Sequence, residues 1–362
     1  MHIVIDARIV NSSTGRYVER LLHYLQEVDH VNTYTVLVPS KDLNYWTPTS
    51  KNFTVKAADY ANYSFSEQLG FKNFLNHLQP DLVHFCMPQQ PILYSGASVT
   101  TFHDLTLFDT YNSDKNWLIF HLKQLIGRFV FTMAARKTRH IITPSEYTRQ
   151  DVSKRLGVSL DKITVTYEAV GASSETTTPY PHPFKKFILY VGQQSDYKNI
   201  QRLGDAHQKL LETHPDLGLI LVGSKNVAAQ KNETYFAAQG YRNIHFTGFI
   251  DDAQLAWLYK HCDVYAFPSL MEGFGLPGLE AMNYGAPIAS SNTTCLPEVY
   301  GTAAHYFNPV DTSDITRAIA DILDTPQLRE ELIASGYEQV KKYSWRRMAE
   351  QTHNVYLDAV KK

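Results

Sequence analysis

Two glutamates, Glu272 and Glu280, stand eight residues apart around a turn with the sequence GFGLP. An apolar run at Asp263–Pro268 predicts a buried strand before the turn. Pro277 and a helical pattern to Asn283 predict a short helix after it. A spacing of eight does not stack two carboxylates on one helical face. We therefore expect the glutamates to flank the helix N-terminus, with Glu280 in the first turn.

The start of this helix could bind an anion, because its first backbone N–H groups have no partner within the helix. We expect these groups to come from about Phe274, Gly275 and Leu276. The pattern suggests a nucleotide sugar, with diphosphate oxygens on the backbone donors and sugar or ribose hydroxyls on the carboxylates. The alternative for an isolated E-x7-E is a turn whose carboxylates only cap and solvate a helix.

A second candidate anion site follows the predicted strand Lys186–Val191. Gly192 ends this strand, and Lys198 lies at the start of the next helical pattern. A lysine on a flexible stem suits an anion held by a mobile positive charge.

His103 and Asp104 directly follow the predicted strand Ser98–Phe102. Ligands of open α/β sheets bind outside the carboxyl ends of the strands, so His103 is expected to face a ligand. A lone histidine is as often a structural residue. Asp104 is expected to orient the imidazole or the loop.

The segments FPSLMEGFGLPGLEAM and LPEV resemble glycosyltransferase family 4, whose members are retaining enzymes of the GT-B fold. Glu272 and Glu280 match the E-x7-E motif of that family. The resemblance extends along nearly the whole chain and is closest to the mannosyltransferase-like branch of cell-surface polysaccharide assembly. It implies an α/β chain of two Rossmann-like, doubly wound domains that face a central cleft.

The resemblance also implies roles for single residues. Glu280 would accept the ribose hydroxyls of the donor, and Glu272 would hold the donor sugar and support positive charge at its anomeric carbon. Lys198 would bind the diphosphate. His103, in the context T-x-H-D-L, would contact the donor sugar. These four residues, together with the turn at Phe274, Gly275 and Leu276, form the predicted active site.

Further donor contacts are implied at Gly15, Arg16, Gln193 and Phe249. Gly15 and Arg16 match a glycine-rich loop of the family, although capping of the following helix is the simpler explanation. Gln193 stands where many relatives carry an arginine, so the diphosphate would lose one charge-assisted contact. Phe249 resembles the loop beside the nucleobase, and a place in the core is the alternative.

The length of 362 residues suits two domains. Predicted strands and helices alternate, which favours parallel sheets with crossover helices. A Thr- and Pro-rich, non-periodic stretch predicts a linker. We expect an N-terminal, acceptor-side domain at 1–170 plus 345–362, a linker at 171–184 and a nucleotide-sugar-binding domain at 185–344. The return of the last helix to the first domain is implied by the resemblance.

Composition narrows the function classes. With a net charge of −2, the chain has no excess of positive charge of the kind that binds nucleic acid. Three scattered cysteines argue against a disulfide framework, and no histidine pattern predicts a metal site. The first residues read as a strand rather than a signal peptide, and no apolar run could span a bilayer. We therefore expect a cytoplasmic protein without metal or cofactor.

A helical stretch at 116–140 is both apolar and basic. Between Asp114 and Arg155 there are nine Lys or Arg residues against three acidic ones. A core helix with a solvated basic face is the common explanation. The alternative is a surface that meets anionic lipid headgroups on the inner face of the membrane and brings the enzyme to a lipid-linked acceptor.

The predicted function is transfer of a hexose, with mannose from GDP-mannose favoured, to a glycan or lipid-linked acceptor. UDP-glucose, UDP-galactose or UDP-N-acetylglucosamine could be the donor instead. A non-catalytic binder of nucleotide sugars is a second alternative, supported only by Gln193. A dehydrogenase is disfavoured, because no G-x-G-x-x-G follows the strands at Ile3–Asp6 or Ile188–Val191.

Overall fold

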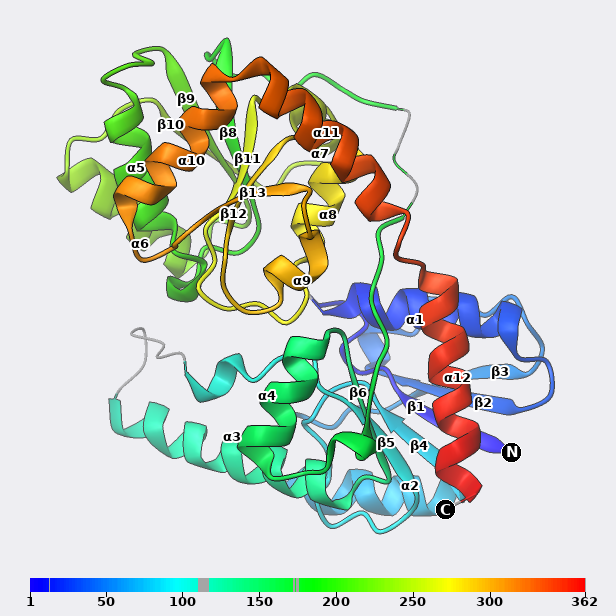
Figure 1. Cartoon of the computed structure of the whole chain (residues 1–362). Coiled ribbons are helices and arrows are strands. Elements are labelled where there is room, and N and C mark those ends of the chain that lie inside the picture. Colours follow the sequence, from blue (N-terminus) through cyan, green and yellow to red (C-terminus); the bar gives the residue numbers. More distant parts are fainter. Residues whose placement is uncertain (13, 110–116, 172, 174–175, 362) are drawn as a thin grey trace. The chain divides into compact units, whose positions relative to one another are not determined.

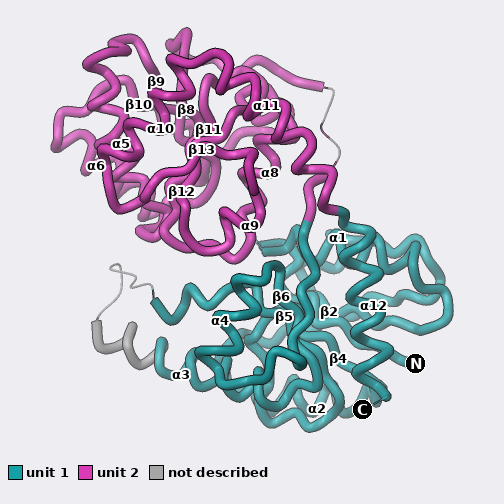
Figure 2. Tube along the Cα trace, in the orientation of Figure 1, with its two compact units in different colours: residues 1–168, 344–362 teal, residues 169–343 magenta. Residues whose placement is uncertain are grey.

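The computed structural model describes residues 1–12, 14–109, 117–171, 173 and 176–361, and for 117–123 it describes the backbone alone. Contacts divide the chain into two compact units (Figures 1 and 2). Unit 1 comprises Met1–Glu168 and Ser344–Lys362, and unit 2 comprises Ala169–Tyr343.

Unit 1 is built on a parallel sheet of seven described strands in the order β3-β2-β1-β4-β5-β6-β7. The strands are β1 (His2–Asp6), β2 (Thr33–Val38), β3 (Phe53–Ala57), β4 (Leu82–Phe85), β5 (Ser98–Thr101), β6 (His140–Thr143) and β7 (Ile163–Val165). The α-helices are α1 (Gly15–Val28), α2 (Lys72–Leu78), α3 (Trp117–Lys137), α4 (Glu146–Leu156) and α12 (Trp345–Lys361).

Unit 2 repeats this design with six described parallel strands in the order β10-β9-β8-β11-β12-β13. The strands are β8 (Lys186–Val191), β9 (Leu217–Val222), β10 (Ile244–Gly248), β11 (Val264–Phe267), β12 (Ile288–Ser291) and β13 (Ala304–Phe307). The α-helices are α5 (Ile200–Leu210), α6 (Val227–Ala238), α7 (Asp252–His261), α8 (Leu276–Asn283), α9 (Leu296–Tyr300), α10 (Thr312–Asp324) and α11 (Pro326–Val340).

In both sheets the strand order reverses at one place. The reversal lies between β1 and β4 in unit 1 and between β8 and β11 in unit 2. Such a switch point opens a crevice at the carboxyl ends of the two strands, because their crossover helices leave to opposite faces of the sheet. The topology therefore supplies one ligand crevice per unit.

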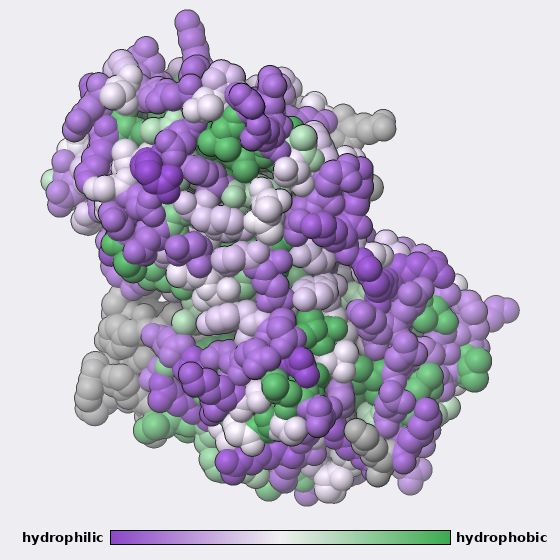
Figure 3. Space-filling view, viewed as in Figure 1, coloured by the Kyte–Doolittle hydropathy of each residue, from purple (hydrophilic) through white to green (hydrophobic). Residues whose placement is uncertain are grey.

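Hydrophobic burial explains why these segments form a sheet. β9 is buried along its whole length, as expected for a strand with helices on both faces. In unit 1, one core cluster packs Phe102 and Ile141 of the sheet region against Phe131 of α3 and Val152 of α4. In the view of Figure 3, hydrophilic residues cover most of the surface and hydrophobic ones form smaller patches.

The last helix, α12, belongs to unit 1 and packs on α1 (Figure 1). The buried imidazole of His84 on β4 links this helix to the sheet. Its Nδ1 lies 2.6 Å from the hydroxyl of Tyr356 on α12, and its Nε2 lies 2.8 Å from Thr101 Oγ1. The hydroxyl of Tyr17 on α1 lies 3.0 Å from the same threonine oxygen.

The stretch that we expected to be a linker, 171–184, lies within unit 2 where it is described. The backbone N–H of Thr178 donates to the carbonyl of Ala253, and the Tyr180 hydroxyl lies 3.0 Å from His245 Nε2. The ring of His182 packs 5.6 Å from that of Trp257. The chain passes from one unit to the other at Glu168–Ala169 and again at Tyr343–Ser344.

Candidate active site

An ion pair occupies the switch point of unit 2. Lys198 ends a short 3-10 helix after β8, and Glu272 lies in the loop after β11. The Nζ atom of Lys198 is 2.5 Å from Oε1 of Glu272. Two candidate residues that are 74 positions apart in the sequence are thus brought into direct contact.

The ion pair is largely shielded from water, with side-chain exposures of 13% for Lys198 and 12% for Glu272. Burial opposes the positive charge of Lys198, but the attraction and hydrogen bond of Glu272, together with Tyr190 and Tyr197, outweigh this effect and raise the pKa of Lys198. The ammonium also lies 5.1 Å and 5.7 Å from the ring centres of Tyr197 and Phe267. Lys198 is therefore held as a cation at this site.

The two loops that carry the pair are fastened to each other. The backbone N–H of Leu270 donates to the carbonyl of Tyr197 over 2.8 Å. Asn199, in a left-handed conformation, donates its amide to the carbonyls of Pro268 and Pro309. The sequence did not single out Asn199, although an asparagine at a strand-to-helix turn was the available signal. Its side-chain amide fixes the geometry of the site.

Glu280 lies one position later in the helix than we predicted. Helix α8 begins at Leu276 rather than Pro277, which makes Glu280 its fifth residue and places it in the second turn. The Tyr259 hydroxyl lies 3.5 Å from Oε2 of Glu280. The helix starts one residue early because Gly275 takes a left-handed conformation, with φ of 94°, and directs the chain into the helix.

The turn before α8 is held in place by a side chain of α9 and by Tyr343, the last residue of unit 2. The Tyr300 hydroxyl donates to the carbonyl of Gly275 over 2.6 Å. The ring of Phe274 is buried and packs edge-on against Tyr343 at 5.6 Å. The Cys295 thiol donates to the carbonyl of Glu272 over 3.3 Å. Phe274 thus packs within the protein through its ring, so only its backbone remains a candidate donor contact.

Two other predicted donor contacts lie on the surface of unit 2. Gln193 is exposed, and its backbone carbonyl accepts a hydrogen bond from Tyr190. Phe249 follows β10 and is 89% exposed, which rules out the alternative that it belongs to the core. Leu276 is partly buried at the first position of α8.

His103 has two polar partners in unit 1. Its Nδ1 lies 3.4 Å from Oε1 of Glu168, and its Nε2 lies 3.1 Å from the carbonyl oxygen of Cys86. The ring of Tyr17 packs edge-on against the imidazole at 4.8 Å. Asp104 instead accepts from the backbone N–H of Thr106, so it organises the loop. Glu168 is the carboxylate that orients the imidazole.

Gly15 and Arg16 form the first turn of α1, also in unit 1. A side chain at Gly15 would lie 1.8 Å from the carbonyl oxygen of Val10, so the chain itself requires glycine here. Gly15 is buried and Arg16 is exposed. Close approach to its own backbone accounts for Gly15 without any ligand.

The basic region that we predicted around α3 is described only in part. Asp114 and Lys115 lie outside the described residues, as does the side chain of Lys123. Among the described residues of α3, Leu125 and Phe129 are 63% and 57% exposed.

No described helix has both the length and the apolar character needed to cross a membrane. The described residues also contain no group of three or more His, Cys, Asp or Glu placed to hold a metal ion.

Two doubly wound, parallel-sheet units in one chain match the GT-B architecture. Solved structures support this fold. Sucrose-phosphate synthase of Thermosynechococcus elongatus superposes with a TM-score of 0.78 at 18% identity, over 99% of this chain and 98% of that one. Anabaena Alr3699/HepE in complex with UDP and glucose superposes with a TM-score of 0.73 at 15% identity, over 98% of each chain.

Sequence comparison identifies the family. Residues 14–173 match the model "Glycosyltransferase Family 4", and residues 180–339 match "Glycosyl transferases group 1". The O-antigen chain mannosyltransferase B of Escherichia coli is 30% identical over 275 residues, which cover 72% of this chain and 70% of that protein. The chain belongs to glycosyltransferase family 4, in its mannosyltransferase-like branch, and is a hexosyltransferase.

Proposed function

We propose that this protein transfers a mannosyl residue from GDP-mannose, with retention of anomeric configuration, to a glycan or lipid-linked acceptor. The observation that carries the proposal is the buried Lys198–Glu272 pair at the switch point of unit 2. The similarity to a mannosyltransferase supports mannose as the sugar. A UDP-sugar is the alternative donor, favoured by the structural likeness to a protein solved with UDP and glucose.

Donor binding would change the partner of Lys198. In the structure, Glu272 neutralises the ammonium. A bound diphosphate would attract Lys198 away from the carboxylate, because it carries more negative charge. Glu272 would then be released to hold hydroxyls of the donor sugar and to support positive charge at the anomeric carbon. Lys198 would stabilise the charge that develops on the leaving diphosphate.

A single carboxylate near the anomeric carbon suits front-side displacement. In this mechanism the leaving phosphate takes the proton of the acceptor hydroxyl, so the paired acid and base of glycosidases are not required. Glu280 would accept hydrogen bonds from the ribose, and the backbone N–H groups at the start of α8 would face the diphosphate. His103, held by Glu168, would contact the donor sugar from unit 1.

A thermal-shift panel of GDP-mannose and UDP-, ADP- and other GDP-sugars tests the proposal. A ligand at 100 times its dissociation constant stabilises the folded protein by about 2.7 kcal/mol. We expect GDP-mannose to raise the melting temperature most and to release GDP slowly without acceptor. A larger rise in melting temperature with a UDP-sugar would identify that UDP-sugar, rather than GDP-mannose, as the donor. Binding of a sugar nucleotide without any hydrolysis or transfer would favour the non-catalytic alternative.

Peripheral contact with an anionic membrane is a second part of the proposal. Exposed Leu125 and Phe129 on α3, with Arg128 and Arg136 on the same helix, combine apolar and basic character. Such a helix can insert its apolar side chains while its arginines contact lipid phosphates. Sedimentation with vesicles is expected to pellet the protein with anionic but not zwitterionic lipid. Equal and negligible binding to both kinds of vesicle would contradict the proposed membrane contact.

A further inference from the structure

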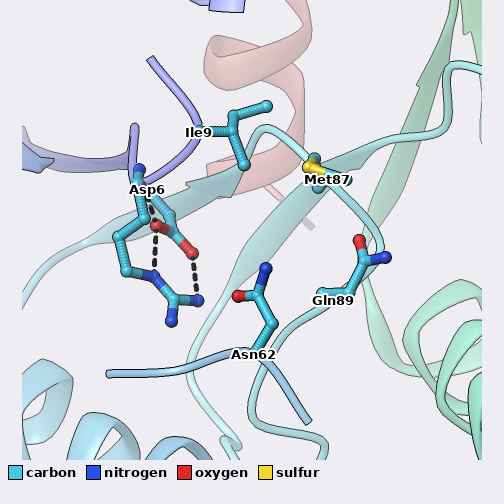
Figure 4. Close-up of a pocket in the computed structure, with 6 residues that line it drawn as sticks. Asp6, Ile9, Asn62, Met87 and Gln89 are labelled. Atoms are coloured by element: carbon cyan, nitrogen blue, oxygen red, sulfur yellow. Dashed lines mark hydrogen bonds and ion pairs between the residues drawn. The ribbon is translucent and has the colours of Figure 1, made fainter. Parts of the chain in front are cut away.

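Two cavities of unit 1 differ in size. The smaller one, between Asp6 and Gln89 (Figure 4), has a volume of about 10 Å³ and suits a single water molecule. The larger one has a volume of about 180 Å³. It is lined by the loop between β4 and β5, by Ser98 at the start of β5 and by Lys137 of α3. Because an engineered protein cavity of about 150 Å³ binds benzene, the larger cavity can hold a small ligand.

This larger cavity, which we call the Lys137 cavity, is separate from the predicted active site. Ser98 begins β5, and Lys137 lies shortly before the start of β6, so both lie beside the amino ends of their strands. His103 instead follows the carboxyl end of β5, where a doubly wound sheet binds its ligand. Among the described residues, none of the predicted site residues lines the Lys137 cavity. A ligand bound here would therefore need a role other than that of donor or acceptor.

Two buried side chains that line the Lys137 cavity have unpaired polar atoms. Gln90 is 4% exposed, and its Oε1 accepts from the Thr100 hydroxyl, but its Nε2 has no hydrogen-bond partner among the described residues. Tyr94 is 7% exposed, and its hydroxyl also has no partner among them. A side chain at Gly96 would lie 2.2 Å from this hydroxyl, so the glycine leaves it accessible. Buried polar groups of native proteins are generally hydrogen-bonded, which favours a ligand or water at both atoms.

Lys137 gives the cavity a positive charge. Its Nζ donates to the carbonyl of Ile92 over 2.6 Å, which uses one of its three N–H groups. None of the described residues that line the cavity is acidic. Burial raises the pKa of Tyr94 to about 12, so its hydroxyl keeps its proton at neutral pH. An ammonium, a phenol and an amide N–H thus offer hydrogen bonds to one ligand, and this combination favours an anion.

We infer that the Lys137 cavity binds a phosphate group, with Lys137 Nζ, Tyr94 Oη and Gln90 Nε2 as its hydrogen-bond donors. The oxygens of a phosphate point in several directions and can accept from three side chains at once, and the contact with lysine is charge-assisted. The phosphate can belong to a soluble ester or to the headgroup of an anionic lipid. This site is distinct from the proposed donor site, where the diphosphate is assigned to Lys198 of unit 2.

The test is calorimetric titration of the full chain with glycerol 3-phosphate at constant ionic strength. We expect binding, with the affinity about tenfold lower in Lys137→Met and in Tyr94→Phe, because each variant removes a hydrogen bond to a charged group. Tyr94→Phe removes only an unpaired hydroxyl, so its melting temperature should equal or exceed that of the wild type. Lys162→Met is the control. Lys162 Nζ also donates to a backbone carbonyl, that of Arg136, but Lys162 does not line the cavity, so this variant should bind like the wild type.

The proposed donor site could bind the same probe, so Lys198→Met is titrated as well. Binding that is weakened in Lys137→Met and Tyr94→Phe but kept in Lys198→Met belongs to the Lys137 cavity. Binding that depends on Lys198 alone, or no binding of glycerol 3-phosphate at all, would overturn the inference. Acetate bound as tightly as glycerol 3-phosphate would also overturn it, because the cavity would then be a carboxylate site.

Vesicle sedimentation distinguishes the two sources of the phosphate. Tyr94→Phe changes no charge, so weaker sedimentation of this variant than of the wild type with phosphatidylglycerol vesicles would identify a lipid headgroup. Equal sedimentation, together with weaker binding of glycerol 3-phosphate, would identify a soluble ester. Both results support a phosphate site in the Lys137 cavity.

Discussion

The candidate active site depends at the residue scale on one buried cation. Lys198→Met removes the charge proposed to stabilise the leaving diphosphate and leaves Glu272 without its partner. Loss of one such electrostatic group typically lowers kcat by about 10²–10³-fold. We expect this loss in a transfer or donor-hydrolysis assay with the donor identified by thermal shift.

A second lysine provides the control. Lys231 forms an ion pair with Asp196 in the same unit, but both side chains are substantially exposed. Exposed pairs contribute about 0–1 kcal/mol, so Lys231→Met should leave kcat unchanged. A kcat of Lys198→Met equal to that of Lys231→Met would exclude the diphosphate role.

Substitutions of the two glutamates are expected to affect different steps, one nucleotide binding and the other turnover. Glu280→Ala should weaken nucleotide binding, because Glu280 is proposed to hold the ribose, whereas Glu272→Ala should mainly lower turnover. Titration of free GDP by calorimetry measures the first effect without any sugar. Equal affinity for GDP in the wild type and Glu280→Ala would contradict the ribose assignment.

The contact between β4 and α12 makes the stability of unit 1 depend on pH. Burial lowers the pKa of His84 from 6.5 to about 3, because a charged imidazole there would lose its hydration, and the nearby His103 lowers it further. The unfolded chain binds a proton below pH 6.5 that the folded chain does not bind. This contribution is therefore present in full above pH 6.5 and is lost as the pH falls toward 3.

Each pH unit in that window corresponds to about 1.4 kcal/mol, so lowering the pH from 7 to 5 should cost about 2 kcal/mol through His84 alone. Urea denaturation at the two pH values measures the loss. His84→Gln has no ionisable group at this position and should show a smaller difference between the two pH values. An equal difference in both proteins would show that His84 does not control the acid sensitivity.

The turn into α8 requires glycine for two reasons. Gly275 has φ of 94°, and a Cβ there would lie 2.6 Å from the Tyr300 hydroxyl and 2.7 Å from Leu296. Gly240 has a similar φ of 69°, but no atom lies within 4 Å of its Cβ position. Gly240→Ala should therefore cost only the backbone strain of about 1–2 kcal/mol.

Gly275→Ala should cost more than Gly240→Ala and should also weaken donor binding, because the displaced turn carries the N-terminus of α8. Differential scanning calorimetry and donor titration of both variants measure the two effects. Equal melting temperatures for the two variants would show that the turn can move away from Tyr300 at no cost.

The strands were predictable where a short apolar run stands between polar breaks. Lys186–Val191 was predicted with its observed bounds, because it is a nearly continuous run of apolar, β-forming residues. Strand β13 was not predicted, since Ala304–Phe307 includes a histidine and a tyrosine that remain partly exposed. The family resemblance and the GT-B fold were confirmed by the comparisons.

The site was predictable only where a local motif carries it. Glu272 and Lys198 each belong to such a motif, but their contact does not follow from either one. Glu168 was missed as the partner of His103 because the two are 65 positions apart. The contact between Arg8 and Glu67 spans 59 positions for the same reason. Partner choice across a sheet depends on strand order, which a single sequence does not state.

At the scale of the whole molecule, the two units differ in how their chains are arranged. Unit 2 is one continuous segment, Ala169–Tyr343, whereas unit 1 needs the last residues of the chain for α12. The buried side chains of Trp345, Met348 and Tyr356 on α12 pack in unit 1. Removing this helix would expose their partners and leave His84 without the Tyr356 hydroxyl.

This asymmetry predicts different outcomes for two truncations. Residues 169–343 produced alone should fold cooperatively, because the segment contains a complete sheet with its helices, and should bind free GDP with a thermal shift like that of the full chain. Residues 1–343 should lose the transition of unit 1 and keep that of unit 2. Calorimetry with and without free GDP resolves the two transitions. Neither fragment should transfer sugar, because acceptor binding is proposed to need unit 1. An isolated 169–343 segment that is unfolded, or one that folds without binding free GDP when the full chain binds it, would show that nucleotide binding depends on both units.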